Sequence, residues 1–135
     1  MVTITILVDN FAYKEELKGG WGFSALIATP TDTVLFDTGP EPELLKFNAR
    51  ALGINLSFVE VVVLSHEHWD HVGGLEAVLE ANPRVKVIRP GSPEPVQVAE
   101  GITTTGTLPG EPLPEQGLIV KTSEGPVLLV GCSHP

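Results

Sequence analysis

The sequence predicts an α+β fold in which two β-sheets pack face to face with helices outside them, as a partial αββα sandwich. Short apolar and β-branched runs recur along the whole chain, and two segments space their apolar residues as helices do. The predicted order is strands, helix, strand, helix and then mostly strands. Because these elements supply only half to two thirds of such a sandwich, we expect residues 1–135 to form one domain that is incomplete.

The first third of the chain is predicted to form three strands. Residues 11–20 are predicted to form a loop or a short helical turn, and residues 23–29 and 33–37 a hairpin around Thr29-Pro30-Thr31-Asp32. The strand over residues 2–8 is expected to have one strongly apolar face, made of Val2, Ile4, Ile6 and Val8.

A helix is predicted to follow the hairpin. Glu41-Pro42-Glu43 opens it, because proline suits the first turn and acidic side chains there complement the helix dipole. Gly53 is predicted to end it. Its apolar stripe is expected to pack into the core and consists of Leu44, Leu45, Phe47, Ala51 and Leu52.

The middle of the chain predicts a buried strand followed by a second helix. The continuous apolar run over residues 61–64 is typical of a central strand that is covered on both faces. After Gly73-Gly74, helical spacing begins at Leu75 and closes at Asn82-Pro83. The connection between these two elements is therefore held by a rigid element at each end.

The last third is predicted to be mostly strands and loops. Residues 85–88 form the next strand, and a proline-rich stretch then surrounds short strands at 96–99 and 102–105. Residues 118–121 and 126–130 are predicted to form a hairpin.

All four histidines of the chain lie at two places. His66, His68 and His71 share a six-residue string with Asp70, and His134 follows the last strand. Imidazole nitrogen and carboxylate oxygen are ligands that zinc and similar ions prefer. Residues two apart face the same side in extended backbone but not on a helix, so we expect the string to be a loop. The pattern predicts a metal site for one or two ions, and the alternative is a polar surface loop.

Two other candidate site residues, Asp37 and Cys132, have two interpretations each. Asp37 is predicted to accept a hydrogen bond from a ligand imidazole or from backbone, or instead to cap the Thr38-Gly39 turn. Cys132 is either a soft metal ligand or, as we expect, a small buried residue near a strand end. Glu67 and Trp69 alternate with the ligands and are expected to face away from them.

Three segments resemble the metallo-β-lactamase superfamily. Residues 64–75, Leu-Ser-His-Glu-His-Trp-Asp-His-Val-Gly-Gly-Leu, resemble its signature loop, and residues 130–135, Val-Gly-Cys-Ser-His-Pro, resemble its second histidine motif. Residues 34–39 are similar to the early strand whose aspartate, here Asp37, lies beneath the metals. With Val8-Asp9-Asn10, the chain most resembles the branch of dihydropterin/aminobenzene-phosphate synthase-like metal-dependent hydrolases. The resemblance covers essentially the whole chain.

The resemblance implies a ligand set. His66, His68 and His134 would hold a first ion, and Asp70 and His71 a second, with Zn²⁺ expected and Mn²⁺ or Fe²⁺ as alternatives. Superfamily members continue beyond the second histidine motif and supply a further histidine ligand, which has no counterpart in these 135 residues. The resemblance therefore implies a C-terminally truncated chain, a completing partner chain or a weakened second site.

The predicted ligands imply a reaction, and the resemblance implies a substrate-binding loop. An ion held by neutral imidazoles lowers the pKa of bound water from 15.7 to roughly 7, and Asp70 is the candidate catalytic residue that orients the resulting nucleophile. The loop over residues 11–20 would overhang the site, so Phe11, Tyr13 and Trp21 are candidate substrate contacts or ordinary rim packing. We expect a hydrolase that directs metal-activated hydroxide at a small phosphorylated or ester-like substrate. The alternatives are a metallonuclease and a non-catalytic metal-binding fragment that needs a C-terminal part or a partner chain.

Composition bears on partners and location. The formal net charge is −9, with eight basic residues scattered among seventeen acidic ones, so a nucleic-acid partner is disfavoured. The sequence has no long uncharged apolar stretch, which argues against a membrane span or a secretory signal. The single cysteine excludes an internal disulfide and fits a cytoplasmic location. Because a partial sandwich leaves apolar sheet surface uncovered, we expect a homo-oligomer or a completing C-terminal segment.

Overall fold

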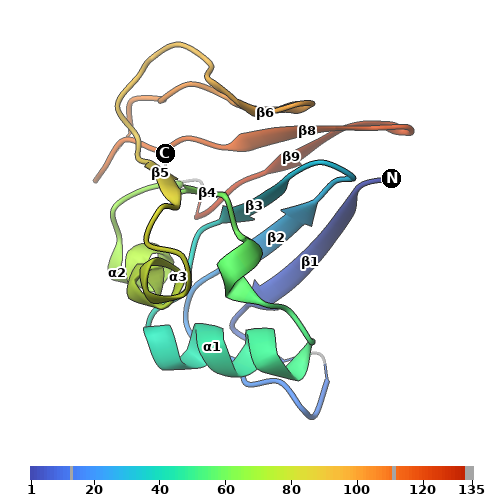
Figure 1. The fold of residues 1–135 in the computed structure, drawn as a ribbon. Coiled ribbons are helices and arrows are strands. Elements are labelled where there is room, and N and C mark those ends of the chain that lie inside the picture. The colour runs from blue at the N-terminus through green and yellow to red at the C-terminus, as the bar shows by residue number, and fades with distance from the viewer. Residues whose placement is uncertain (13, 111, 133–135) are drawn as a thin grey trace.

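The computed structural model describes residues 1–12, 14–110 and 112–132. Two β-sheets pack face to face, and the helices cover the outer face of the first sheet (Figure 1). Among the described residues, no helix covers the outer face of the second sheet. The predicted α+β sandwich is confirmed, with three of its four layers present.

The first sheet contains five strands in the order β1-β2-β3-β4-β5. Strands β1 to β3 are antiparallel neighbours, whereas β3, β4 and β5 are parallel. The predicted central strand is confirmed, because β4 lies between β3 and β5 and its Val62 and Val63 are buried. The bounds are β1 Thr3–Val8, β2 Ser24–Ala28, β3 Thr33–Phe36, β4 Val61–Val63 and β5 Lys86–Ile88.

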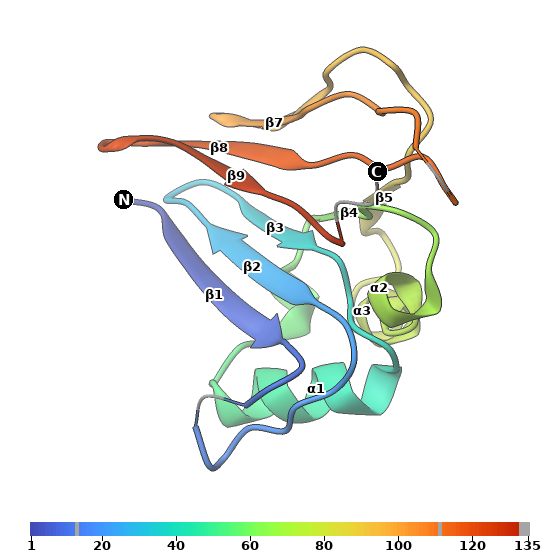
Figure 2. The ribbon, with the colours of Figure 1, turned by 180° about the vertical axis from the view of Figure 1, so that it is seen from behind.

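The second sheet is antiparallel, with the order β6-β7-β8-β9. Seen from behind, β8 and β9 lie above β1 to β3, and α1 lies on the opposite side of the first sheet (Figure 2). All four predicted strands of this region are present, with bounds β6 Gln97–Ala99, β7 Ile102–Thr104, β8 Leu118–Thr122 and β9 Gly125–Leu129.

Both predicted helices form where expected. Helix α1 spans Pro42–Ala51 with proline in its first turn, and α3 spans Leu75–Ala81 and ends at Asn82. Two shorter elements accompany them, the 3-10 helix η1 at Leu56–Phe58 and the single-turn helix α2 at Trp69–Val72. None of these helices is long and apolar enough to cross a membrane, in the part of the chain that the structure describes.

The apolar stripe of α1 differs from the prediction at two positions. Leu44 and Leu45 are buried as expected, but Phe47 is 39% exposed and Ala51 is exposed. Asn48 is buried instead, because its side-chain amide donates to the backbone carbonyls of Leu7 and Lys18. A polar side chain with those partners can occupy the inner face of the helix at no net cost.

Strand β1 also departs from the predicted alternation. Its pairing with β2 shifts register between Ile6 and Val8, so that Leu7 and Val8 are both buried while Ile6 is 44% exposed. Such an irregularity moves the following side chains to the other face of a strand. The expected single face of Val2, Ile4, Ile6 and Val8 is therefore wrong in its second half.

The core lies on both sides of the first sheet. Leu35 and Val62 face the helices, whereas Phe36 and Val63 face the second sheet. Strands β3 and β4 are thus packed on both faces, which fixes the positions of their C-terminal ends. Those ends lead directly to Asp37 and to Ser65.

Strand β9 leaves apolar surface exposed at the edge of the second sheet. Exposed fractions are 59% for Leu128, 36% for Val127 and 45% for Val130, and Ile119 of the neighbouring strand is 37% exposed. The expectation that a partial sandwich leaves apolar sheet surface uncovered is therefore confirmed.

Candidate metal centre

The histidine string follows the central strand β4 directly. His66 is fully buried, and His68 has extended backbone immediately before α2. Asp70 and His71 lie on α2 itself. The prediction of a loop throughout is therefore wrong for this pair, because the chain turns into a helix after His68. The extended geometry expected for His68 is present.

Three imidazole rings converge at this position. The ring centroid of His66 lies 4.5 Å from that of His68 and 4.3 Å from that of His71. Oδ2 of Asp70 lies 3.6 Å from Nε2 of His71. The structure thus brings together four of the five predicted ligands, while His134 lies outside the described residues.

Glu67 and Trp69 point away from the cluster, as predicted. The carboxylate of Glu67 accepts two hydrogen bonds of 2.7 Å from Nη1 of Arg89, and Trp69 is 62% exposed. Both therefore belong to the outer surface of the ligand segment.

Asp37 lies buried beneath the imidazoles, just beyond the end of β3. Its Oδ1 accepts a 2.7 Å hydrogen bond from the backbone N–H of Ser65. Its Oδ2 lies 2.6 Å from Oγ of Ser65 and 2.6 Å from Nδ1 of His71. The backbone of Asp37 has a φ of +59°, a conformation that aspartate tolerates better than most residues. The carboxylate therefore supports the ligand segment rather than capping the Thr38–Gly39 turn.

These contacts assign the protons of two imidazoles. Ser65 has one hydroxyl proton and donates it to Asp37, so Nδ1 of His66, 2.8 Å from Oγ, must be the donor in its contact with Ser65. Nδ1 of His71 likewise donates to Asp37. Each ring then has its lone pair on Nε2. The carboxylate of Asp37 orients both rings for coordination through that nitrogen.

Burial and neighbouring charges shift the pKa values of Asp37 and His71. Burial raises the pKa of Asp37, and the hydrogen bonds from His71 and Ser65 only partly oppose it. Burial lowers the pKa of His71, but the hydrogen bond and charge of Asp37 outweigh it, helped by Asp70 and Glu115. The net result is a raised pKa for His71, because the surrounding carboxylates stabilise positive charge at this position.

We expect cation affinity to keep rising with pH above 6.5, the ordinary pKa of histidine. A proton on Nε2 of His71 must leave before that nitrogen can coordinate, and the raised pKa moves this step to higher pH. Competition of Zn²⁺ with a chromophoric chelator at a series of pH values measures the effect. The Asp37→Asn variant should show the rise at lower pH, and an affinity that is level from pH 6.5 upwards would contradict the assignment.

Cys132 also reaches this cluster. Its Sγ lies 3.1 Å from Nε2 of His71, and one donor atom each of His66, His71 and Cys132 lies within 4.8 Å of the others. Cys132 is exposed, so the expectation of a small buried residue is wrong. Partial desolvation of its sulfur and the nearby acids, Asp70 first, raise the pKa of the thiol.

The donor atoms fit a divalent cation of the zinc type. Zinc binds imidazole nitrogen at about 2.0–2.1 Å and thiolate sulfur at about 2.3 Å, so two such donors in tetrahedral geometry lie about 3.5 Å apart. The donor atoms of the cluster lie within 4.8 Å of one another, so shifts of about 1 Å would bring them to one ion. Nitrogen, sulfur and carboxylate oxygen are also the ligand types that such ions select.

A cavity of about 360 Å³ opens onto Asp70, His71 and Cys132. Two aromatic side chains line its rim, and they are widely exposed, Phe11 at 88% and Trp21 at 66%. Both belong to or border the loop that was predicted to overhang the site, whereas Tyr13 lies outside the described residues. The remaining lining residues are Asp9, Asn10, Gly22, Phe23 and Gly131.

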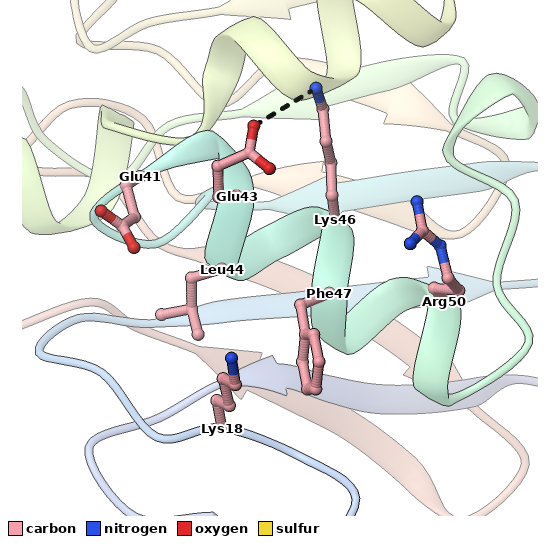
Figure 3. A pocket seen from close by; sticks show the side chains of 7 residues that line it. All are labelled: Lys18, Glu41, Glu43, Leu44, Lys46, Phe47 and Arg50. Carbon is pink, nitrogen blue, oxygen red and sulfur yellow. Dashed lines mark ion pairs between the residues drawn. The ribbon is translucent and has the colours of Figure 1, made fainter.

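A second hollow of about 240 Å³ lies along α1 (Figure 3). Two of its three basic side chains, Lys46 and Lys18, already have partners within the protein. Nζ of Lys46 lies 3.2 Å from Glu80 and 3.7 Å from Glu43, and Nζ of Lys18 lies 4.2 Å from the ring centre of Phe47. This hollow is a charged surface of the helix, and its described lining contains neither histidine nor cysteine.

The family model described as Metallo-beta-lactamase superfamily matches residues 19–132. The chain belongs to this superfamily. The matched range includes the histidine string, Asp37 and Cys132, so the histidine cluster lies within the matched domain. The resemblance expected from the three sequence segments is confirmed.

Two relatives from Methanocaldococcus jannaschii match this chain of the metallo-β-lactamase superfamily. The uncharacterized protein MJ0448 is 44% identical over 77 residues, which cover 57% of this chain and 29% of that protein. The second relative is 7,8-dihydropterin-6-methyl-4-(beta-D-ribofuranosyl)-aminobenzene-5'-phosphate synthase. It is 24% identical over an alignment that covers 97% of this chain and 67% of that protein.

Among solved structures, the metallo-β-lactamase fold protein YhfI from Bacillus subtilis is similar, with a TM-score of 0.65 and 15% identity. The match covers 94% of this chain and 61% of YhfI. The chain therefore spans less than two thirds of that structure, and the match to MJ0448 covers under a third of that protein. At this identity the likeness establishes the fold.

Sequence reasoning assigned no role to Ser65 or to Gln116. Ser65 connects Asp37 to His66, and its place directly before the histidine string is the one signal that could have indicated this. Gln116 is buried beyond the proline-rich stretch, where its backbone N–H donates to the carbonyl of Ser65 and its side chain to that of Leu64. No local pattern indicates Gln116, because its partners are far away in the sequence.

Proposed function

We propose that this protein is a metal-dependent hydrolase that acts on a small phosphorylated or ester-like substrate. The observation that carries the proposal is the convergence of His66, His68 and His71 beside Asp70, over a buried carboxylate that orients two of the rings. Superfamily membership supports the same class of reaction.

The side chains have distinct roles in the proposed reaction. His66, His68 and His71 bind the cation, joined by Asp70. A divalent ion held by these residues would supply a nucleophile near neutral pH, because such ions lower the pKa of bound water to roughly 7. Asp70 borders the cavity and orients the attacking water, while Asp37 keeps the protons of His66 and His71 on Nδ1.

The cavity supports a small substrate over a nucleic acid. Its described lining contains Asp9, Asp70 and His71 but neither lysine nor arginine, so a polyanion would gain little there. Phe11 and Trp21 offer apolar ring faces at the entrance. The similarity to a protein named as an aminobenzene-phosphate synthase supports a phosphorylated substrate with a ring system.

The test compares three generic substrates: p-nitrophenyl acetate, p-nitrophenyl phosphate and bis(p-nitrophenyl) phosphate. We expect the Zn²⁺-loaded protein to hydrolyse at least one of them, to lose the activity with a chelator and to regain it when Zn²⁺ is restored. His68→Ala should lower kcat/KM at least about 100-fold, because even the loss of an outer partner of a metal ligand costs 10–100-fold.

Glu67→Gln provides the matched control for His68→Ala. It changes the neighbouring residue, whose side chain points outward to Arg89, and should retain activity. Circular dichroism checks that both variants keep the fold. Equal activity of His68→Ala and the unmodified protein would refute the site, and hydrolysis that is insensitive to chelation would refute the metal-dependent reaction.

A further inference from the structure

A smaller cavity, of about 160 Å³, adjoins the histidine cluster. Its lining comes from residues 108–110, 115–117 and 130–131. Gly131 also lines the cavity of about 360 Å³ that opens onto Asp70 and His71, so the two cavities meet at this residue. A Cβ atom on Gly131 would overlap Oγ of Ser65 and would lie 3.3 Å from Cε1 of His66. The smaller cavity therefore begins where the chain passes closely over the ligand segment.

Hydrogen bonds fix the walls of this cavity to the end of β4. Leu108 and Glu115 exchange two backbone hydrogen bonds of 2.8 and 3.1 Å. The neighbouring Gln116 donates its backbone N–H to the carbonyl of Ser65 at 2.8 Å, and its side-chain amide to the carbonyl of Leu64 at 2.9 Å. The cavity is thus held in shape by the protein itself, as small-molecule sites usually are.

The lining combines one carboxylate with apolar surface. The side chain of Glu115 is only 14% exposed, and its Oε1 lies 3.6 Å from Nδ1 of His66. Leu108 and Val130, which also line the cavity, are 59% and 45% exposed. Because a carboxylate can accept several hydrogen bonds at once, its contact with His66 leaves Glu115 able to accept another from a ligand.

These groups determine which end of a substrate suits the cavity. The described lining contains neither lysine nor arginine, so a phosphate group would meet the carboxylate of Glu115 without a compensating cation. An uncharged ring would instead pack its faces on Leu108 and Val130 and direct a donor at Glu115. A cavity of about 150 Å³ is large enough to hold benzene, so this one has room for a single ring.

We propose that this cavity is a substrate subsite for an uncharged aromatic ring, and that the carboxylate of Glu115 accepts a hydrogen bond from an N–H or O–H group on that ring. The inference rests on the proposed function, because the ester or phosphate group of the same molecule lies across Gly131, at the histidine cluster. It narrows the substrate class to esters or phosphates of ring compounds that carry an amino or hydroxyl group.

Two matched pairs of substrates test the role of Glu115: 3-aminophenyl and phenyl acetate, and 3-aminophenyl and phenyl phosphate. A meta amino group adds N–H donors and changes the reactivity of the ester little. We expect kcat/KM to favour the amino ring at least about tenfold, because a hydrogen bond to a charged group is among the stronger ones. Glu115→Leu should bring the ratio to about one. Each ratio is taken within one variant, so a change in metal affinity cancels.

Glu124→Leu is the matched control. It removes a carboxylate from the exposed turn between β8 and β9 and should keep the preference for the amino ring. A binding measurement that needs neither metal nor turnover accompanies it. In methyl NMR spectra of the full chain, 3-methoxyaniline should shift the resonances of Leu108 and Val130. Anisole, which lacks N–H donors, should bind at least about tenfold more weakly.

The outcomes separate this inference from the proposed function. Hydrolysis with no preference for the amino ring, a preference that persists in Glu115→Leu, or methyl shifts that bypass Leu108 and Val130 would each overturn the subsite and leave the reaction standing. Shifts at Leu108 and Val130 in a chain that hydrolyses none of the four substrates would support the ring site and overturn the proposed function. If Glu115→Leu fails to fold, the NMR comparison of the two rings in the unmodified chain still decides.

Discussion

Replacing Asp37 with alanine is expected to cost about 3–5 kcal/mol of folding free energy, because it removes one partner of a buried charged pair. The carboxylate contacts the backbone and hydroxyl of Ser65 and the ring of His71, and each would be left buried without its acceptor. Urea unfolding of the metal-free protein measures the loss. A change below about 1 kcal/mol would show that the carboxylate does not support the ligand segment.

Asp37→Asn separates the electrostatic role of Asp37 from its packing. Asparagine has a similar volume and tolerates the positive φ, so the fold should persist. Its amide can accept from the backbone N–H of Ser65, but its NH₂ group then faces His71 and favours the tautomer whose proton is on Nε2. We expect zinc affinity to fall about 10- to 100-fold. Unchanged affinity would contradict the assigned tautomer.

Gly22→Ala is expected to destabilise the protein and to disturb the metal centre. Gly22 has a φ of +134°, and an added Cβ would overlap the backbone carbonyl oxygen of Asp70. Strain at such a φ costs about 1–3 kcal/mol, and overpacking typically adds about 1–3 kcal/mol. Because α2 must move to relieve the overlap, Asp70 and His71 shift and both zinc affinity and hydrolysis should fall.

Gly125→Ala isolates the backbone part of that effect. Gly125 has a φ of +112°, and nothing lies within 4 Å of an added Cβ. We therefore expect Gly22→Ala to lose about 1–3 kcal/mol more than Gly125→Ala in urea unfolding. Gly125→Ala should also bind zinc normally. Equal losses in the two variants would show that the contact between residue 22 and α2 has no consequence.

The parts of the fold that the sequence predicts correctly are those that local pattern determines. The β-branched run of β4 and the caps of α1 and α3 depend on neighbouring residues, and each lies where it was expected. The register shift in β1 and the burial of Asn48 depend on partners that are distant in sequence. A periodicity argument cannot detect such partners.

The candidate site also contains one part that the local sequence indicates and another part that depends on distant partners. The histidine string is visible because its members are close together in sequence. The links through Ser65 and Gln116 and the approach of Cys132 exist only after both sheets have packed. Cys132 is an example. Its place near a strand end can be predicted from the sequence, but the contact of its sulfur with His71 exists only in the folded chain.

The separation of Cys132 and His71 has a consequence for the whole molecule. The two residues are 61 positions apart and belong to segments that follow different sheets. An ion bound by both would hold the two segments together in the folded chain and would stabilise it, because the folded state offers the assembled site and the unfolded chain does not. In a chain with one cysteine, such an ion would do what a disulfide does elsewhere, and its removal would loosen the sandwich as well as end the reaction.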